Sequence, residues 1–163
     1  MMYTDKDIYY MQIALKEAEI AYECGEVPVG AVVVRDGEVI STGHNLREQN
    51  GIATAHAELL AIEDACRILG GWRLSGCTLY VTLEPCPMCA GALVNSRIDR
   101  VVYGVSDSAA GCLGSVINFN SYPFNHAFNV TGGVCENECR TILRDFFEKR
   151  RLNKKREDAD NEK

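Results

Sequence analysis

Two short motifs that can hold a metal ion between them constrain this chain more than any other feature of its sequence. The first is H-A-E at residues 56–58 and the second is P-C-P-M-C at residues 85–89. Catalytic zinc sites use three protein ligands and leave the fourth position open for water, whereas structural sites fill all four. The imidazole of His56 and the thiolates of Cys86 and Cys89 form such a set of three. Glu58 lies two residues from His56, so it can act on a bound water without binding the metal itself.

The C-x-x-C pair has two other interpretations. A redox dithiol follows the first strand of a thioredoxin-like unit, whereas this pair opens a helix deep in the chain. A structural zinc site would need a further pair of ligands, and the spacing of Cys135 and Cys139 predicts instead two small residues on one helical face. Catalytic metal chemistry is therefore favoured. The other cysteines are expected to be small, buried apolar residues: Cys24, Cys66, Cys77 and Cys112.

The composition is typical of one compact enzyme. The chain has 163 residues, 47% apolar and 25% charged, which predicts a single domain at 1–156 and a disordered polar tail at 157–163. No apolar run approaches the length of a membrane span, and the polar N-terminus does not resemble a signal peptide. Eight cysteines without a secretory signal indicate a reducing compartment. We therefore expect a cytoplasmic protein with no membrane partner.

Charge is distributed unevenly along the chain. Residues 1–148 carry ten Lys and Arg against nineteen Asp and Glu, whereas six of the eight residues at 149–156 are basic. Cations interact favourably with the C-terminal end of a helix dipole, which accounts for two or three of them. A run of six indicates contact with a polyanion as well. Nucleic-acid binding is thus one interpretation of this run, and a solvated helix end is the other.

Periodicity and turn signals predict alternating helices and strands. A capping box at Thr4 and Asp7 begins a helix that ends near Cys24, and the Asp36-Gly37 pair predicts a hairpin. Further helices are expected at 57–69, 88–95 and 137–151, and strands at 29–34, 38–42, 78–82, 100–103 and 128–131, with a polar loop at 45–54. Strands interleaved with helices predict an α/β fold, a layered sheet with helices on both faces.

The three metal ligands fall at the starts of two predicted helices, and this position suits their chemistry. His56 precedes one helix, while Cys86 and Cys89 open another, in whose first turn prolines cost no hydrogen bond. The positive ends of both helix dipoles lower the pKa of the cysteines and favour the thiolates that bind zinc. Zinc in turn lowers the pKa of a bound water toward about 7, and Glu58 can carry the released proton.

Longer runs of sequence resemble one enzyme family. The zinc motifs alone are typical of the cytidine-deaminase-like superfamily, in which a glutamate moves protons while a nucleobase loses an amino group. The runs at 26–34, 43–45, 54–58, 78–92, 96–98, 100–104 and 145–151 resemble the bacterial tRNA-specific adenosine deaminases, and they span nearly the whole chain. The resemblance implies a three-layer α/β/α sandwich with a central mixed sheet.

The resemblance also implies an activity and a set of partners. Members of the family convert adenosine to inosine at the wobble position of a tRNA anticodon, typically of an arginine tRNA. They act as homodimers with one Zn²⁺ ion in each subunit. Carried over to this chain, the metal ligands are His56, Cys86 and Cys89, and the catalytic residue is Glu58.

Five further residues are implied to contact the RNA: Asn45, Asp107, Phe147, Arg150 and Arg151. Asn45 matches an asparagine that hydrogen-bonds the target base. Asp107 matches a loop acid near the nucleotide backbone, and a surface turn residue is an equal interpretation. Ala109 stands where relatives often carry a lysine. Of Phe146 and Phe147, one is expected to pack into the core and the other to face RNA or a partner, where each stacked base gains about 1–3 kcal/mol.

Two other functions share part of the pattern. A deaminase of a free nucleobase or nucleoside, of the guanine or cytosine type, would carry the same zinc motifs, but a free base needs no polycation such as residues 149–156. A zinc-stabilised binding module without activity would need neither Glu58 nor an open metal position. The basic terminal helix and the intact glutamate therefore favour the tRNA enzyme.

Overall fold

The computed structural model describes residues 3–161, and within that range five strands form one sheet. They are β1 (Gly30–Arg35), β2 (Glu38–His44), β3 (Cys77–Leu83), β4 (Arg100–Val105) and β5 (Asn129–Thr131), in the spatial order β2-β1-β3-β4-β5. β1 pairs antiparallel with β2 and β3, whereas β4 pairs parallel with β3 and β5. The sheet is therefore mixed, as the resemblance implied.

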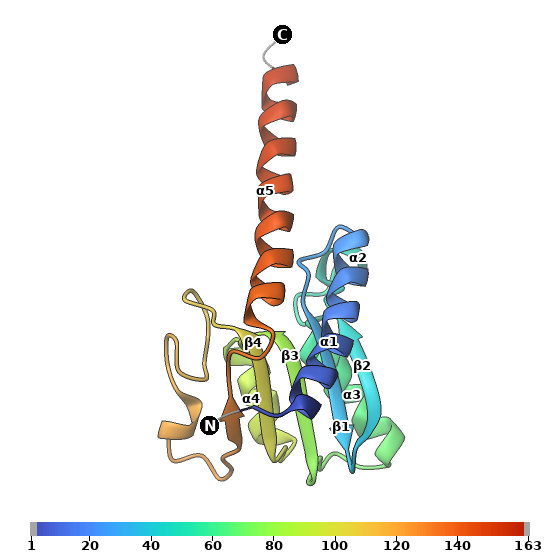
Figure 1. Ribbon diagram of the computed structural model, residues 1–163, viewed down its shortest axis with the longest axis vertical. Helices are drawn as coiled ribbons and strands as arrows, with labels where there is room; N and C mark the ends of the chain where they lie inside the picture. Colours follow the sequence, from blue (N-terminus) through green and yellow to red (C-terminus); the bar gives the residue numbers. More distant parts are fainter. Residues whose placement is uncertain (1–2, 162–163) are drawn as a thin grey trace.

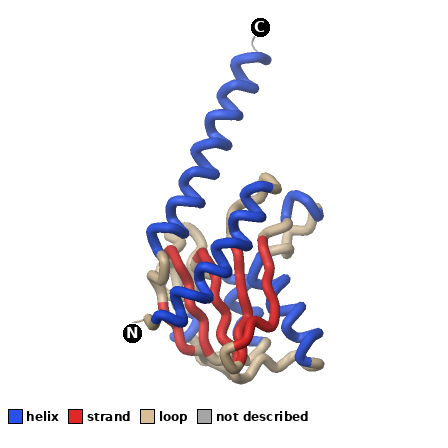
Figure 2. Tube along the Cα trace, turned by 45° about the vertical axis from the view of Figure 1, so that its right-hand side comes forward, coloured by secondary structure: helices blue, strands red, loops and turns tan. Residues whose placement is uncertain are grey.

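Helices cover both faces of this sheet (Figure 1). α1 (Asp5–Glu23) and the start of α5 (Glu136–Asn161) pack on one face, and α3 (Ala57–Leu69) and α4 (Pro87–Asn95) lie on the other. Figure 2 shows the same layers from a second direction, with the strands between the helices. The predicted three-layer α/β/α sandwich is confirmed. No helix within residues 3–161 is long and apolar enough to cross a membrane.

The local signals in the first half of the chain form as predicted. Asp36 and Gly37 have φ values of 52° and 83°, and positive values at both central residues are typical of the hairpin turn whose twist matches its strands. At the start of α1, the Thr4 N–H donates to Asp7 Oδ2 at 2.9 Å, and the Asp7 N–H donates to Thr4 Oγ1 at 3.3 Å, which completes the capping box. Gly70 ends α3 in the left-handed conformation.

Close packing of α3 on β2 fixes the position of the first sequence motif. Gly43 allows this approach, because a Cβ there would lie 2.5 Å from the carbonyl oxygen of Ala57 in the first turn of α3. The Ser41 hydroxyl, also on β2, donates to the carbonyl oxygen of Ala61 at 2.7 Å. The start of α3, with His56 and Glu58, is thereby held against the sheet.

The C-terminal helix is longer than the sequence predicted. We expected a helix to residue 151 and a disordered tail from residue 157, but α5 continues to Asn161, so the prediction is wrong for 157–161. Residues 149–159 are exposed and belong to the part of α5 that projects beyond the sheet (Figure 1). Lys, Arg, Glu and Ala have high helix propensity, which favours continuation of the helix without a buried face. Residues 162 and 163 lie outside the described range.

The four scattered cysteines only partly match their predicted burial. Cys77 and Cys112 are buried as expected, and Cys66 is half-buried. Cys24 is exposed, which contradicts the prediction, because it lies just past the end of α1 where the chain turns outward. Its position at a helix C-terminus, and not on the packed face of α1, explains the difference.

Two further expectations change in detail. α5 begins at Glu136, so Cys135 precedes the helix and does not share a helical face with Cys139, which is buried on it. The predicted polar loop at 45–54 contains a single helical turn, α2 (Arg47–Asn50). Neither change moves a residue of the predicted metal cluster.

Candidate active site

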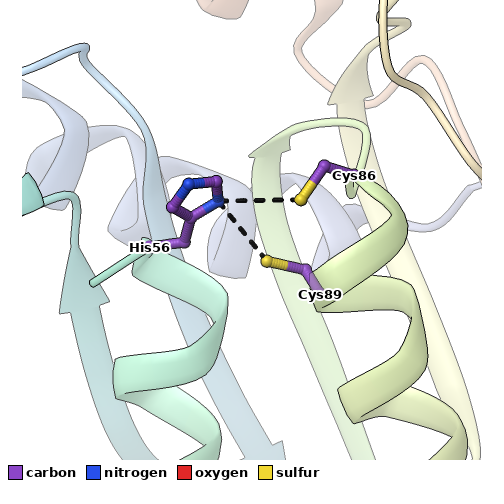
Figure 3. A group of neighbouring side chains, drawn as sticks. All are labelled: His56, Cys86 and Cys89. Atoms are coloured by element: carbon purple, nitrogen blue, oxygen red, sulfur yellow. Dashed lines mark hydrogen bonds between the residues drawn. The ribbon is translucent and has the colours of Figure 1, made fainter. Parts of the chain in front are cut away.

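The N-termini of α3 and α4 bring the two sequence motifs together (Figure 3). His56 is the N-cap residue of α3, with an extended backbone at φ −81° and ψ 150°. Cys86 is the N-cap residue of α4, and Cys89 lies in the first turn of that helix, after a proline at its first position. The histidine ring and the two thiols point toward one another from the two helices.

The three donor atoms have the spacing of one metal site. His56 Nδ1 lies 3.7 Å from Cys86 Sγ and 3.6 Å from Cys89 Sγ, and the three ligand atoms all lie within 4.8 Å of one another. Zinc bonds of about 2.0–2.1 Å to nitrogen and about 2.3 Å to sulfur, at tetrahedral angles, would separate the two kinds of atom by about 3.6 Å. The observed distances match this value, so the cluster fits a metal ion held by three protein ligands.

The electrostatics of the two cysteines also favour a cation. Hydrogen bonding to Cys89 and then to His56 lowers the pKa of Cys86 to about 4, against the opposing effect of burial. The same contact with Cys86, together with burial, raises the pKa of Cys89 far above its usual range. One thiolate thus disfavours the second, and a divalent cation between them would stabilise both in the anionic form.

Glu58 lies in the first turn of α3, beside the cluster but not within it. Its side chain is almost completely buried, and this burial raises the pKa of the carboxyl group above its ordinary value. The neighbouring Cys86 raises that pKa further, while His56 lowers it. A buried carboxyl group beside the cluster can accept and return a proton, which general acid–base catalysis requires.

A cavity of about 180 Å³ opens beside the cluster. Its walls include His56, Glu58, Cys86, Asn45 and Asp107. The structure therefore brings Asn45, predicted to contact the target base, and Asp107, predicted to lie near the nucleotide backbone, to the metal cluster. At about 30 Å³ for each water in the liquid, the cavity has the volume of roughly six waters. It has room for one flat ring and not for a folded loop.

Asn45 faces this cavity with hydrogen-bonding capacity to spare. Its Oδ1 accepts the Arg47 N–H at 3.3 Å, and its Nδ2 donates to the carbonyl oxygen of Val27 at 3.4 Å. A side-chain amide has two N–H donors and two acceptor lone pairs, so one donor and one acceptor stay free. These bonds orient the amide and leave it able to contact a ring placed in the cavity.

Asp107 has the geometry of a turn residue and also lines the cavity, while its contact with RNA stays a prediction. It lies just after β4, and its Oδ1 accepts the Ala109 N–H at 2.9 Å, which is the geometry of a turn aspartate. It also lines the cavity, and it borders a second hollow of about 500 Å³ that extends over residues 106–109 to Arg144 and Phe147 on α5. The cavity and the outer groove therefore meet at this residue.

The two phenylalanines divide as expected. Phe146 is 7% exposed and packs edge-on against Tyr22 of α1, with ring centroids 5.8 Å apart. Phe147 is 41% exposed and lines the outer groove. One ring therefore anchors α5 to the body, and the other is available at the groove that leads to the cavity.

The structure does not bring Arg150 and Arg151 to the cavity. Arg150 lines a groove with Tyr22 and Phe146, whereas Arg151 lies in a different hollow with Leu152 and Lys155 on the projecting part of α5. Successive helical residues point about 100° apart, so the two guanidinium groups leave the helix on different sides. Any shared ligand must extend well beyond the cavity.

Sequence reasoning assigned no role to Glu84, the residue just before Pro85 in the second motif. Its side chain is buried, lines the cavity, and accepts hydrogen bonds from the loop that carries Asp107. Its only signal in the sequence is an acidic residue at the end of a buried strand, directly before the metal ligands.

Fold and site together define a deaminase whose His-Cys-Cys cluster fits a metal ion, since such a cluster with a neighbouring glutamate is the signature of the nucleobase deaminases. Comparison with known proteins agrees: the model of the MafB19-like deaminase family matches residues 4–151. The tRNA-specific adenosine deaminase of Bacillus subtilis (strain 168) is 53% identical over 151 residues, which cover 92% of this chain and 94% of that protein. The chain belongs to the tRNA-specific adenosine deaminase family.

Solved structures give the same assignment. A structure from studies of A-to-I editing by tRNA:A34 deaminases is 46% identical, with a TM-score of 0.81, and the match covers 83% of this chain and 99% of the other. A guanine deaminase from Bacillus subtilis is 30% identical, with a TM-score of 0.58 over 72% of this chain and 85% of the other. The fold is therefore shared with an enzyme named for a free base, but the sequence identity to the tRNA:A34 deaminase structure is higher than the identity to the guanine deaminase.

Proposed function

We propose that this protein deaminates adenosine to inosine at the wobble position of a tRNA anticodon. The observation that carries the proposal is the cavity in which the metal cluster, Glu58 and Asn45 meet, at the inner end of a groove that leads to Phe147. A cavity sized for one ring, with a longer groove outside it, suits one nucleotide of a larger RNA. The high identity to the named relatives supports the same substrate.

We propose that His56, Cys86 and Cys89 hold one zinc ion in each subunit. The match of their spacing to tetrahedral zinc and the electrostatic demand of two neighbouring thiols support this assignment. When bound, zinc supplies the Lewis acidity that makes a water molecule nucleophilic near neutral pH.

Glu58 is proposed to move the protons of the reaction. Water adds to C6 of the adenine, the bond from C6 to the exocyclic nitrogen breaks, and ammonia leaves. This exchange requires one proton to reach the ring nitrogen and another to reach the departing amine. Glu58 takes one proton from the attacking water and delivers it to the ring nitrogen, and then takes the second proton from the new C6 hydroxyl and delivers it to the departing amine. Burial raises the pKa of Glu58, which favours the protonated form that donates.

Asn45 is proposed to hold the inserted base. Its backbone contacts orient the amide, and the free donor and acceptor can pair with a purine edge. Asp107 is proposed to contact the nucleotide backbone where the cavity joins the outer groove. Phe147 offers an exposed ring in that groove on which a neighbouring base can stack.

The basic part of α5 is proposed to bind phosphates of the RNA stem. Lys149, Arg150, Arg151 and the basic residues after them are exposed on α5, where Lys149 and Arg150 still border Tyr22 of the body. Because Arg150 and Arg151 face different sides, they would contact different phosphates or different turns of the RNA. Such contacts position the RNA and make its binding depend on salt.

Three finer assignments follow from the family resemblance. We propose an arginine tRNA as the substrate, a homodimer as the active form, and the cytoplasm as the location. The loop at 116–124 supports the dimer, since it carries exposed apolar side chains that a second copy of the chain would cover: Val116, Ile117, Tyr122 and Phe124. Sedimentation of the purified protein tests the dimer, and a monomer at micromolar concentration would contradict it.

A free-base deaminase is the second candidate. The likeness to a guanine deaminase favours it, because that enzyme has the same fold. The two functions differ in their use of the groove and of residues 149–156, which a free base would not touch. Incubating the purified protein with unmodified tRNA transcripts and, separately, with guanine, cytosine and adenosine decides between them. We expect inosine at the wobble adenosine, whereas ammonia released only from free bases would contradict the proposal.

A further inference from the structure

Glu84 lies where the loop of Asp107 meets the metal ligands. Its side chain is 1% exposed. Its Oε2 accepts the Asp107 N–H at 3.0 Å and also accepts the Ser115 hydroxyl, and its Oε1 accepts the N–H groups of Leu113 at 2.9 Å and Ser115 at 3.1 Å. Four donors from one loop therefore converge on a single carboxylate, which follows β3 and precedes Cys86 by two residues.

The Asp107 loop, defined here as residues 106–118, is built around this carboxylate. A Cβ added at Gly111 would collide with the Glu84 carboxylate, so the loop backbone passes directly against it. The Cys112 N–H donates to the carbonyl oxygen of Pro85 at 2.9 Å, which links the loop to the metal-ligand turn a second time. The loop, all of it described, contains no helix or strand of the sheet that would hold it in place.

We propose that Glu84 is a positioning residue, which fixes the Asp107 loop relative to the metal ligands and thereby sets how tightly the enzyme holds its RNA. The inference rests on the proposed function, since it concerns how that site holds that substrate. Glu84 acts through Asp107: its carboxylate takes the Asp107 N–H, and the Asp107 side chain then borders both the cavity and the outer groove. The carboxylate is occupied by the loop and is not assigned to proton transfer.

Glu84→Gln isolates this role, because the amide oxygen can still accept two of the four donors and the amide nitrogen can keep the contact with the Ser115 hydroxyl in the reverse direction. Its oxygen can stay on the Oε1 side and accept from Leu113 and Ser115, while its NH₂ group can donate to the Ser115 oxygen. The Asp107 N–H then loses its acceptor, and the loop is released at that residue. Loss of one buried hydrogen bond to a charged acceptor corresponds to a change of roughly tenfold or more in an equilibrium constant.

The test measures binding of a minimal anticodon stem-loop with a wobble adenosine, in a Glu58→Ala background that prevents turnover. We expect Glu84→Gln to raise the dissociation constant about tenfold. In the active enzyme, KM should rise by a similar factor, while the single-turnover rate at saturating RNA changes less than about threefold. Metal content should be unchanged.

Coupling to Asp107 separates a positioning role from a general loss of stability. Adding Glu84→Gln to Asp107→Ala should change binding by less than about twofold, because the Asp107 side chain, which Glu84 positions through the backbone N–H, is already absent. Glu26→Gln is the matched control: this carboxylate is also 1% exposed and accepts one N–H, from Gln49 at 2.7 Å, without a link to the Asp107 loop. It should bind the stem-loop within about twofold of the parent.

Three results would overturn the proposal: unchanged binding in Glu84→Gln, full additivity with Asp107→Ala, or an equal loss in Glu26→Gln. If Glu84→Gln does not fold, Gly111→Ala displaces the same loop with the carboxylate intact, and it should weaken RNA binding at unchanged metal content. Wild-type protein assayed alongside distinguishes a failure of the proposed function from a failure of the role of Glu84. No turnover of the stem-loop by the wild type would overturn the proposed function and this inference together, whereas the three results above overturn only the role of Glu84.

Discussion

Asp7 and Arg100 form an ion pair between a buried carboxylate and a partly exposed guanidinium group, 93 positions apart in the chain. Arg100 Nη1 lies 2.7 Å from Asp7 Oδ1, and Nη2 lies 3.1 Å from Oδ2. The Tyr80 hydroxyl donates to the same carboxylate at 3.0 Å. One side chain at the start of α1 is thus bonded to both β3 and β4, which pair in parallel.

We predict that this pair makes the stability of the protein fall at acidic pH. Burial alone would raise the pKa of Asp7, but hydrogen bonds from Arg100, Thr4 and Tyr80 outweigh it and lower the pKa from 3.8 to about 2. The ionised carboxylate therefore stabilises the fold fully above about pH 4, and this stabilisation is lost as the pH falls through about 2. The shift corresponds to about 2 kcal/mol in the free energy of unfolding, measurable by urea denaturation across this range.

Arg100→Met tests the same pair at neutral pH. Removing Arg100 leaves the buried Asp7 carboxylate without its ion-pair partner, so we expect a loss of about 3 kcal/mol. Arg67→Met is the matched control, because Arg67 also forms ion pairs, with Glu63 and Asp64, but is exposed on α3. Its loss should stay below about 1 kcal/mol. Equal losses in the two variants, or a difference between Arg100→Met and wild type that does not shrink near pH 2, would contradict the assignment.

Metal content tests the proposed ligands. The purified protein should hold about one zinc ion per subunit, and the double variant Cys86→Ala, Cys89→Ala should hold almost none, because two of three ligands are removed. Cys24→Ala with Cys135→Ala is the matched control, since both cysteines lie outside the cluster. Elemental analysis gives the ratio directly. Full metal content in the first variant would show that the ion is held elsewhere.

Glu58→Ala should separate metal binding from catalysis. The variant should fold and keep its metal, because the carboxylate is not part of the cluster, yet lose at least 10²- to 10⁴-fold in single-turnover rate, the range of about one general acid–base step. Glu63→Ala, on the exposed side of the same helix, serves as the control and should keep its rate. A Glu58→Ala rate near that of the wild type would rule out the proton-transfer role.

Removing residues 149–163 should weaken tRNA binding and flatten its dependence on salt. Each phosphate contact that is lost reduces the slope of log affinity against log salt by about 0.7–0.9. A second truncation, after Arg156, keeps the basic run and removes only the helix end, so it should bind like the full chain. The metal content of both should equal that of the wild type. An unchanged slope in the shorter protein would show that residues 149–156 do not contact phosphates and are only a solvated helix end.

The fold and the metal cluster were accessible from sequence because each part carries its own local signal. The Asp36-Gly37 pair marks the hairpin, and it has the positive φ values that such a turn requires. His56, Cys86 and Cys89 stand at helix starts, and helices on neighbouring strands of one sheet bring those starts together. The sequence motifs and the sheet topology therefore both predict one metal cluster at these helix starts.

The contacts that stabilise and organise the site were not accessible, because their partners are distant and unmarked. Glu84 accepts hydrogen bonds from residues 23, 29 and 31 positions away, and no sequence pattern predicts contacts at such separations. Asp7 was noticed only as a capping residue, and its bond to Arg100 depends on how α1 crosses β3 and β4. The end of α5 was misjudged for a different reason: helix and coil differ little in energy for an exposed, charged segment, so composition alone does not decide between them.

The most direct test of the account compares one adenosine in three settings: in a minimal anticodon stem-loop at the wobble position, in a perfect duplex, and as the free nucleoside. A cavity sized for one ring requires the nucleotide to be turned out of its stack, which costs least where the base is unpaired. The proposed contacts with Asp107, Phe147 and α5 are available only to an RNA and not to the free nucleoside. We predict efficient inosine formation in the stem-loop, with little in the duplex or the nucleoside. Equal kcat/KM for the stem-loop and free adenosine would contradict the account and favour a small-molecule deaminase.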